Sequence, residues 1–247
     1  MLTTVIIPTY NRAALLPRAV NSLLRQLRDV PLDIVVADDG STDDTPQVLT
    51  TLAAAHPQVR WFRQDNAGVA SARNLGLRNL HPQAQWISFL DSDDVSPAGR
   101  FAADLPLLQA DPTLDLTYGR MSRVDDIAAE SLEPTPTSIR IDMTGIQLSC
   151  GLYRRTLIDK VGVFDLSLPQ AEDTDYLLRI FESGARFVQT STNCLYYFRH
   201  TGNMTLDTAA AKRCFAAALF RSIQRRKADP SRVLHKPDFF LQPPHLP

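Results

Sequence analysis

The chain has 247 residues, of which 44% are hydrophobic, so it can bury a sizeable core and is not a disordered chain. Its 26 basic and 27 acidic residues give a formal net charge of -1, and this balance indicates no nucleic-acid partner. The three cysteines form no C-x-x-C pair, and no apolar run approaches the roughly 18 residues that span a bilayer. We therefore expect a cytoplasmic protein without a zinc site or a disulfide framework.

The first 91 residues alternate between the period of a strand and the period of a helix. We expect strands at residues 3–8, 32–40, 59–65 and 85–91, and helices at residues 12–26, 45–57 and 69–80. Strands that alternate with helices are typical of a parallel sheet with right-handed crossovers. The sequence therefore predicts an α/β protein with a Rossmann-like, mostly parallel central sheet flanked by helices.

The pattern is less regular beyond Asp94. We expect a helix at residues 101–111, a strand at 114–124, a mobile loop near 130–138, a helix from Glu172 to Ser183 and one or two strands at 186–200. Gly184 is placed to end the helix before it. No internal repeat of solenoid period is present.

A last helix is predicted from Thr208 to Lys227, and five prolines follow it. One side of this helix carries four apolar residues, Phe215, Leu219, Phe220 and Ile223, and six basic residues lie elsewhere on it. We expect the apolar residues to pack onto the rest of the protein or onto a second subunit as a homo-oligomer. The alternative is peripheral contact with an anionic membrane surface, which would suit a lipid-linked substrate.

Two predicted strands end in acids, at Asp38-Asp39 and at Asp91-Ser92-Asp93-Asp94. We expect these strands to be adjacent, and ligands bind beyond the carboxyl ends of parallel strands. Clustered carboxylates can be solvated, paired with bases or bound to a cation such as Mg²⁺ or Mn²⁺. Turn and helix-cap chemistry would explain either cluster alone, but two clusters favour a metal and ligand site. No G-x-G-x-x-G or P-loop follows the first strand, which disfavours a dinucleotide or P-loop site.

Five segments that follow one another along the chain resemble a known family. They are VIIPTYNR, VVADDGSTDDT, DNAGVASARNLGL, ISFLDSDD and AEDTDYLLRI. Together they resemble the inverting family 2 glycosyltransferases of the GT-A fold, over residues 3–205. The resemblance implies a GT-A domain at 1–206, with a nucleotide-binding half at 1–94 and an acceptor-binding half at 95–206. Residues 207–247 then form a basic amphipathic helix and a proline-containing tail.

The resemblance also implies a role for each matched residue. Those assigned to the donor nucleotide are Pro8, Thr9, Tyr10, Asp38, Asp39, Arg73 and Asp91. Those assigned to Mn²⁺ or Mg²⁺ are Asp93, Asp91 and His200, with His200 reaching either the metal or the diphosphate. Asp173 matches the general base, and Glu172 before it is expected to position groups or cap the helix. Without the resemblance, Tyr10 would be a packing residue, Arg73 a solvated helix arginine and His200 a structural histidine.

The predicted function is metal-dependent, inverting transfer of one sugar from a nucleotide-diphosphate donor, a UDP-sugar, to a hydroxyl of a glycan or lipid-linked acceptor. This places the protein in glycan or polysaccharide biosynthesis. No Q-x-x-R-W follows Glu172-Asp173, which favours a non-processive enzyme. The alternatives are a sugar-nucleotide nucleotidyltransferase, for which a glycine-rich basic loop is missing near the N-terminus, and a catalytically silent carbohydrate-binding protein.

Overall fold

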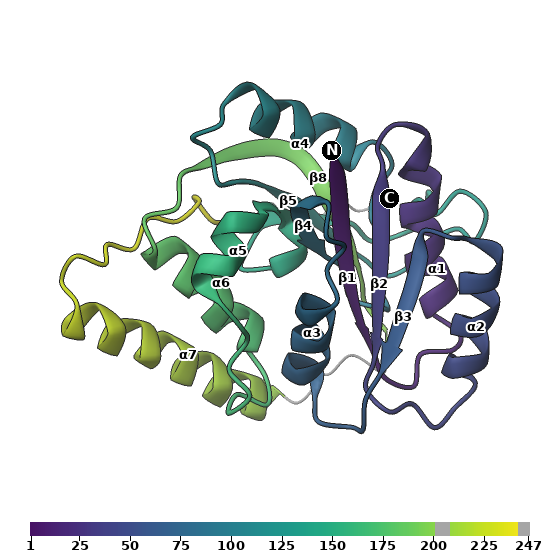
Figure 1. Cartoon of the computed structure of the whole chain (residues 1–247), viewed down its shortest axis with the longest axis horizontal. Helices are drawn as coiled ribbons and strands as arrows, with labels where there is room; N and C mark the ends of the chain where they lie inside the picture. Colours follow the sequence, from purple (N-terminus) through teal and green to yellow (C-terminus); the bar gives the residue numbers. More distant parts are fainter. Residues whose placement is uncertain (201–207, 242–247) are drawn as a thin grey trace.

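The computed structural model describes residues 1–200 and 208–241 of the chain. Its first half is the predicted succession of strands and helices (Figure 1). Four parallel strands lie in the order β3-β2-β1-β4, with bounds β1 Leu2–Thr9, β2 Leu32–Asp38, β3 Val59–Arg63 and β4 Ala84–Phe89. β1 and β2 consist almost entirely of buried residues, as expected for strands covered on both faces. The predicted α/β class with a mostly parallel central sheet is confirmed.

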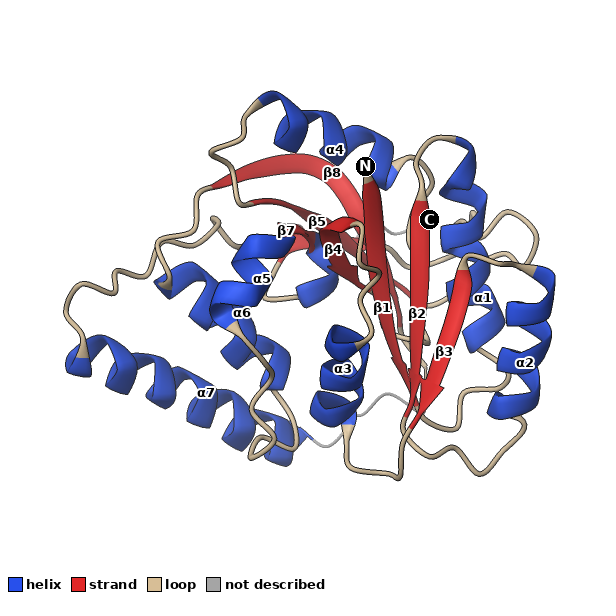
Figure 2. Cartoon of the chain, in the orientation of Figure 1, coloured by secondary structure: helices blue, strands red, loops and turns tan. Residues whose placement is uncertain are grey.

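Helices cover both faces of this sheet (Figure 2). Successive side chains of β1 point to opposite faces, so Val5 and Ile7 belong to one core cluster and Ile6 to the other. The first cluster is covered by α1 Leu16–Leu24, which runs into the 3-10 turn η1 Arg25–Arg28, by α2 Thr45–Ala55 and by α4 Arg100–Ala110. The second is covered by α3 Val69–Arg78, α5 Arg155–Val161 and α6 Glu172–Glu182.

The second half of the chain extends the sheet beyond β4, in the order β4-β7-β5-β6-β9. The bounds are β5 Leu116–Val124, β6 Ile141–Thr144, the 3-10 turn η2 Leu148–Cys150, β7 Gly151–Arg154, β8 Phe187–Phe198 and β9 Phe240–Leu241. β7 is antiparallel to both of its neighbours, and β8 pairs parallel to β5. The predicted strands at 114–124 and 186–200 are confirmed, whereas β6, β7 and β9 are too short to give a periodic pattern.

One sequence-based expectation about the sheet needs correction. β1 lies between β2 and β4, so the two strands that end in acids are not adjacent, although all three end at the same edge of the sheet. The segment near 130–138 contains no helix or strand, as expected for a loop. It is attached by a bridge between Ile127 and Pro134 and by an ion pair of 3.1 Å between Arg25 and Glu133.

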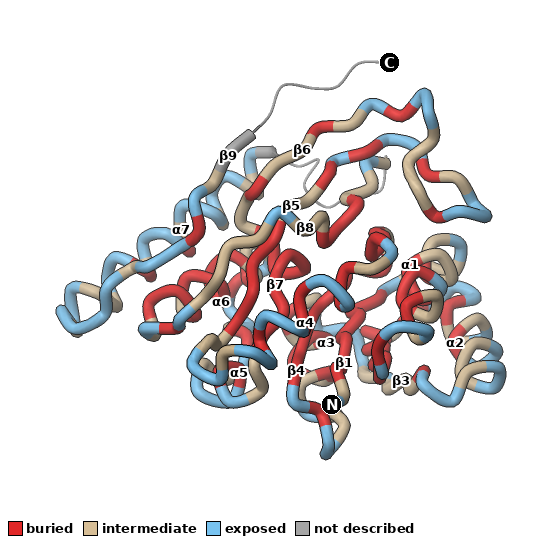
Figure 3. Tube along the Cα trace, turned by 90° about the horizontal axis from the view of Figure 1, so that it is seen from above, coloured by how far each residue is buried: buried red, intermediate tan, exposed pale blue. Residues whose placement is uncertain are grey.

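The C-terminal helix α7, Thr208–Ala228, packs along α6 and lies at the edge of the molecule (Figure 3). Ala218 and Ser222 are buried, and Arg225 lies between two buried carboxylates, donating to Asp175 Oδ1 at 2.7 Å and to Glu182 Oε2 at 2.8 Å. Polar contacts and small residues therefore attach this helix.

The apolar residues of α7 do not pack as the amphipathic pattern predicts. Phe215, Leu219, Phe220 and Ile223 are 37% to 60% exposed. The expectation that they pack onto the rest of this chain holds only in part. Leu219 borders a small apolar cavity with Leu177 and Phe181 of α6, whereas the residues of α7 that are buried against the protein are Ala218 and Ser222. Within residues 1–200 and 208–241, no helix is long and apolar enough to cross a membrane.

The attachment of α7 predicts a stability effect. Replacing Arg225 by Gln leaves the buried Glu182 without its cation, while Asp175 keeps an ion pair with Arg179. The free energy of unfolding should therefore fall by about 2–4 kcal/mol, the lower part of the range allowing for partial exposure of Arg225. Chemical denaturation of Arg225→Gln, with the exposed Lys227→Gln of the same helix as matched control, measures this. Equal stability of the two variants would show that the ion pairs contribute nothing.

Candidate active site

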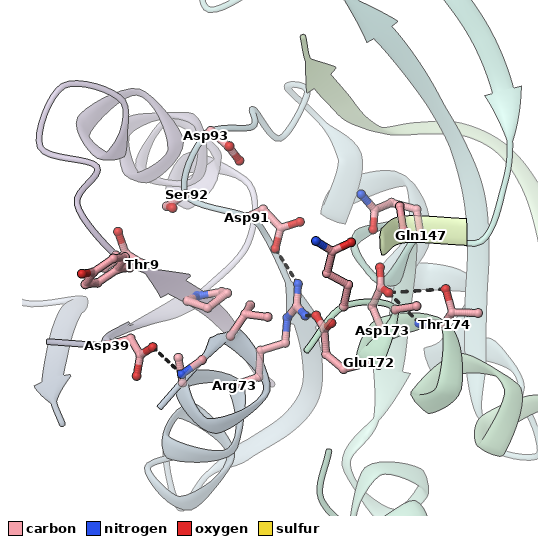
Figure 4. A pocket seen from close by; sticks show the side chains of 18 of the residues that line it. Thr9, Asp39, Arg73, Asp91, Ser92, Asp93, Gln147, Glu172, Asp173 and Thr174 are labelled. Carbon is pink, nitrogen blue, oxygen red and sulfur yellow. Dashed lines mark hydrogen bonds and ion pairs between the residues drawn. The ribbon is translucent and has the colours of Figure 1, made fainter. Parts of the chain in front are cut away.

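A cavity of about 840 Å³ lies at the carboxyl ends of β1, β2 and β4 (Figure 4). Segments far apart in the sequence line it. They are the end of β1 with Pro8, Thr9, Tyr10 and Arg12; Asp39 after β2; Asn66, Gly68, Val69, Ala72 and Arg73 at α3; Asp91, Ser92 and Asp93 after β4; Met121, Ile146, Gln147 and Tyr197; residues 170–174 at the start of α6; and Ala211, Lys212 and Phe215 of α7.

The cavity brings together eight of the ten residues that the sequence singles out as site residues. These are Pro8, Thr9, Tyr10, Asp39, Arg73, Asp91, Asp93 and Asp173. His200 reaches the cavity through a contact with Asp93. Asp38 faces away from it: the side chain is fully buried, accepts a hydrogen bond from the Ser41 amide at 3.0 Å and lies 3.5 Å from Arg63. In this position Asp38 stabilises the turn after β2, and a direct role in donor binding stays a prediction.

Asp39 is fixed at the start of α3. Its Oδ1 accepts hydrogen bonds from Gln64 Nε2 at 2.7 Å and from the Ala67 amide at 3.0 Å, and its Oδ2 accepts one from the Gly68 amide at 2.8 Å. The carboxylate thus satisfies backbone donors at a helix N-terminus. Because a carboxylate has about four acceptor positions, one remains on Oδ2 for a ligand hydroxyl or N–H group.

Arg73 is buried between two acids from distant parts of the chain. Its Nη2 donates to Asp91 Oδ1 at 2.7 Å, and its Nη1 contacts Glu172 Oε1. Burial alone would lower the pKa of Arg73, but Asp91 and Glu172 raise it, so the guanidinium stays charged. Burial raises the pKa of Glu172 to about 7 and also raises that of Asp91, while Arg73 opposes both shifts. The three side chains form one charged unit across the centre of the cavity.

Asp93 lies among basic groups on the other side of the acidic turn. Its Oδ2 is 3.0 Å from His200 Nε2 and 3.8 Å from Arg12 Nε, and its backbone oxygen accepts a hydrogen bond from Arg18 at 2.9 Å. Asp91 and Asp93 therefore have different partners, one facing Arg73 and the other His200.

The residue types at this turn fit a divalent cation. Carboxylates suit Mg²⁺ and Mn²⁺, and imidazole is a further ligand for transition metals. Among the residues that the structure describes, however, no three His, Cys, Asp or Glu side chains form a group that could hold a metal ion. Asp91, Asp93 and His200 are thus an incomplete ligand set, and oxygens of a bound diphosphate would have to supply part of the coordination.

Asp173 lies at the N-terminal end of α6, across the cavity from Thr9 and Asp39, with Asp91 and Arg73 between them (Figure 4). Its Oδ1 accepts a hydrogen bond from the Thr174 amide at 2.6 Å. The residue before the helix, Ala171, has φ 60° and ψ 20°, a left-handed conformation that costs a non-glycine residue about 1–2 kcal/mol. Backbone strain of this kind concentrates at functional sites, and here it sets the direction in which α6 leaves the cavity.

Several lining residues are not predicted from the sequence. Gln147 lies in a short irregular segment without any pattern, and Lys212 and Phe215 lie on a helix whose position depends on tertiary contacts. Arg12 is the last residue of the VIIPTYNR segment, so its position just after the first strand could have indicated that it lines the cavity. Glu172 is expected to position groups or cap the helix, and its ion pair with Arg73 fits positioning.

The fold and this cavity at the sheet edge define an α/β protein of the GT-A type. The structure of S. aureus TarS residues 1–349 in complex with UDP-GlcNAc superposes with a TM-score of 0.74 at 21% sequence identity, covering 93% of this chain and 68% of that one. A mannosyltransferase from Pyrobaculum calidifontis, in complex with GDP-Man and Mn²⁺, gives a TM-score of 0.70 at 21% identity, covering 93% of this chain and 66% of that one. At this identity the similarity establishes the fold.

Residues 4–162 match the family described as Glycosyl transferase family 2, and the chain belongs to this family. Escherichia coli chondroitin synthase is 35% identical over 124 residues, which cover 50% of this chain and 18% of that protein. The chain spans only 15% to 31% of the length of the first curated relatives that it matches. The predicted family and fold are confirmed.

The pairing of Arg73 with Glu172 predicts a measurable coupling. Arg73→Gln should lower the free energy of unfolding by about 3 kcal/mol, because Glu172 and Asp91 lose their cation. In the double variant with Glu172→Gln part of this loss should be recovered, giving a coupling energy of about 1–3 kcal/mol. Denaturation of the four proteins measures this, with Arg78→Gln at an exposed position of α3 as matched control. Strictly additive losses would contradict the pairing.

Proposed function

We propose that this protein transfers one sugar, with inversion, from a nucleoside-diphosphate donor to an acceptor hydroxyl. The observation that carries the proposal is the placement of Asp39, the Asp91-Asp93 turn and Asp173 in one cavity, in this order from one side to the other. We assign residues 1–94 to the donor and residues 95–206 to the acceptor. Membership of glycosyl transferase family 2 favours a transferase over a nucleotidyltransferase or a silent carbohydrate-binding protein.

The donor nucleoside is assigned to the side of the cavity formed by β1 and β2. The acceptor position left on Asp39 can take a hydrogen bond from a pyrimidine N–H or a ribose hydroxyl, and the half-exposed ring of Tyr10 offers a face to the base. We infer a UDP-sugar as donor. The complex of TarS with UDP-GlcNAc supports this inference. The main alternative is a GDP-sugar, because the mannosyltransferase is in complex with GDP-Man.

We assign Asp93, Asp91 and His200 to a divalent cation, Mn²⁺ or Mg²⁺, which would stabilise negative charge on the departing diphosphate. The mannosyltransferase of the same fold is in complex with Mn²⁺, which supports this assignment. Arg73 holds Asp91 in position. His200, which follows strand β8, contacts Asp93 of the same turn. Donor binding would reorganise these two contacts, since each uses a carboxylate oxygen.

Asp173 is assigned as the base that takes the proton from the acceptor hydroxyl. It is separated from the Asp91-Asp93 turn by Arg73 and Glu172, so it faces the part of the cavity formed by α6, Gln147 and α7. An acceptor there would attack from the side opposite the leaving diphosphate. The acceptor is a glycan or a lipid-linked sugar, and the similarity to chondroitin synthase supports a role in polysaccharide biosynthesis.

The donor assignment predicts metal-dependent binding of UDP. Calorimetric titration should show binding with Mn²⁺ that is lost in EDTA, and Asp93→Ala should weaken it by roughly tenfold or more, as when a metal site loses a supporting group. Asp65→Ala, an exposed acid outside the cavity, is the matched control and should bind as the wild type does. Equal affinity in EDTA would rule out the metal, and unchanged binding by Asp93→Ala would remove this residue from the site.

The base assignment predicts a selective loss of turnover. Asp173→Asn keeps the shape of the side chain and removes its charge, so kcat should fall about 10²- to 10⁴-fold while UDP affinity stays near that of the wild type. Glu172→Gln should reduce the chemical step less, because this residue pairs with Arg73. Steady-state kinetics with an identified donor and acceptor measure both, and NMR of the product anomer tests inversion. Retention of the donor configuration, or an undiminished kcat in Asp173→Asn, would refute the mechanism.

A further inference from the structure

The outer side of α7 combines exposed apolar and basic side chains. Arg213, Ala216, Phe220, Ile223 and Lys227 follow one another at spacings of three and four residues, so they form one stripe along the helix. All five are exposed, Phe220 to 60%. The opposite side of the helix is attached to α6 through Arg225. The fold therefore holds α7 with this stripe facing outward.

A neighbouring loop adds to the apolar surface. The loop at 162–171, between α5 and α6, descends to α7 (Figure 1), where Arg221 donates to Asp165 Oδ2 at 2.6 Å and to Ser167 Oγ at 3.0 Å. On this loop Val163 is 60% and Leu166 is 64% exposed. The exposed apolar side chains of this loop thus belong to an element that is fixed to α7.

The charge of α7 indicates what this surface contacts. The helix contains six Lys or Arg residues and no Asp or Glu, although the whole chain has a formal net charge of -1. Arg221 and Arg225 are used in ion pairs within the protein, whereas Lys212, Arg213 and Lys227 are exposed. A helix that lies along the surface with exposed cations and no acid complements the negative charge of an anionic bilayer.

We propose that the outer stripe of α7 docks the protein on the surface of an anionic phospholipid membrane. A second copy of this chain is a poorer occupant, because a two-fold contact centred on the stripe would place the cations of one helix against those of the other. Phospholipid headgroups supply the opposite charge, and the acyl region accepts the side chains of Phe220 and Ile223.

The same helix also forms part of the cavity wall. Ala211, Lys212 and Phe215 line the cavity on one side of α7, while the stripe occupies its outer side. A membrane that contacts the stripe would therefore lie beside the acceptor part of the cavity. If the proposed function is right, this placement favours an acceptor that is linked to a membrane lipid rather than a freely diffusing one.

Co-sedimentation of the full chain with vesicles tests the docking surface. Binding should be stronger to vesicles of phosphatidylcholine mixed with phosphatidylglycerol than to phosphatidylcholine alone, and salt should weaken it. Phe220→Ser should lower the partition coefficient roughly tenfold or more, the equivalent of losing burial of one large apolar side chain. Arg213→Gln and Lys227→Gln should each lower it about fivefold, since a cation near such a surface contributes about 1 kcal/mol.

The matched control is Leu107→Ser, on α4 at the other side of the molecule, which is exposed to 39% and should bind vesicles as the wild type does (Figure 1). Equal binding to both kinds of vesicle, or to neither, would overturn the proposal. So would a dimer in analytical ultracentrifugation that Phe220→Ser abolishes without any change in vesicle binding. UDP titration of the same variants separates this result from the proposed function, because none of the substituted residues lines the cavity.

Discussion

The buried guanidinium of Arg73 is the interaction on which the arrangement of the cavity depends. It joins Asp91, at the end of a strand in the first half of the chain, to Glu172, at the start of α6 in the second half. A buried cation is costly to desolvate and needs both partners, and the buried Glu172 and the partly buried Asp91 are stabilised as carboxylates by the cation in turn. Because the three groups require one another, the start of α6 is fixed against the acidic strand end, and Asp173 is carried to the side of the cavity facing α7.

The helix α6 passes this constraint on to the rest of the molecule. Its first residue pairs with Arg73, and two carboxylates further along, Asp175 and Glu182, hold Arg225 of α7. Two sets of ion pairs, joined by the backbone of α6, thus link the strand end to α7. Since α7 supplies part of the cavity wall, this side of the cavity depends on contacts far from the acidic turn. Because α6 carries the partners of both Arg73 and Arg225, the position of α7 depends on where α6 is held.

The sequence predicts the fold where strands are long and helices have a regular apolar period. β1, β2 and β4 are such strands, and the residues at or just after their ends, Thr9, Asp39, Asp91 and Asp93, meet at one sheet edge as expected. The strands β6, β7 and β9 have at most four residues, so periodicity cannot find them. The orientation of α7 could not be predicted either, because the rule that an apolar face packs inward fails for a helix that Arg225 attaches through buried acids. Asp38 and Asp39 are the same residue type at neighbouring positions, so the sequence cannot tell them apart. In the structure the side chain of Asp38 binds the turn after β2, and that of Asp39 lines the cavity.

The distribution of charge in the cavity explains why a carboxylate turn can serve an anionic donor at all. Asp91 faces Arg73, and Asp93 lies beside His200 and Arg12, so each of these two acids has a basic neighbour. A diphosphate that enters adds negative charge to a site whose arginines already have carboxylate partners. On the proposed function, favourable binding requires positive charge to enter with the diphosphate, and the carboxylates of the turn are the groups able to share it. We therefore propose that the acids bind the donor indirectly, through a countercharge, which makes two aspartates at a strand end compatible with a nucleoside diphosphate beside them.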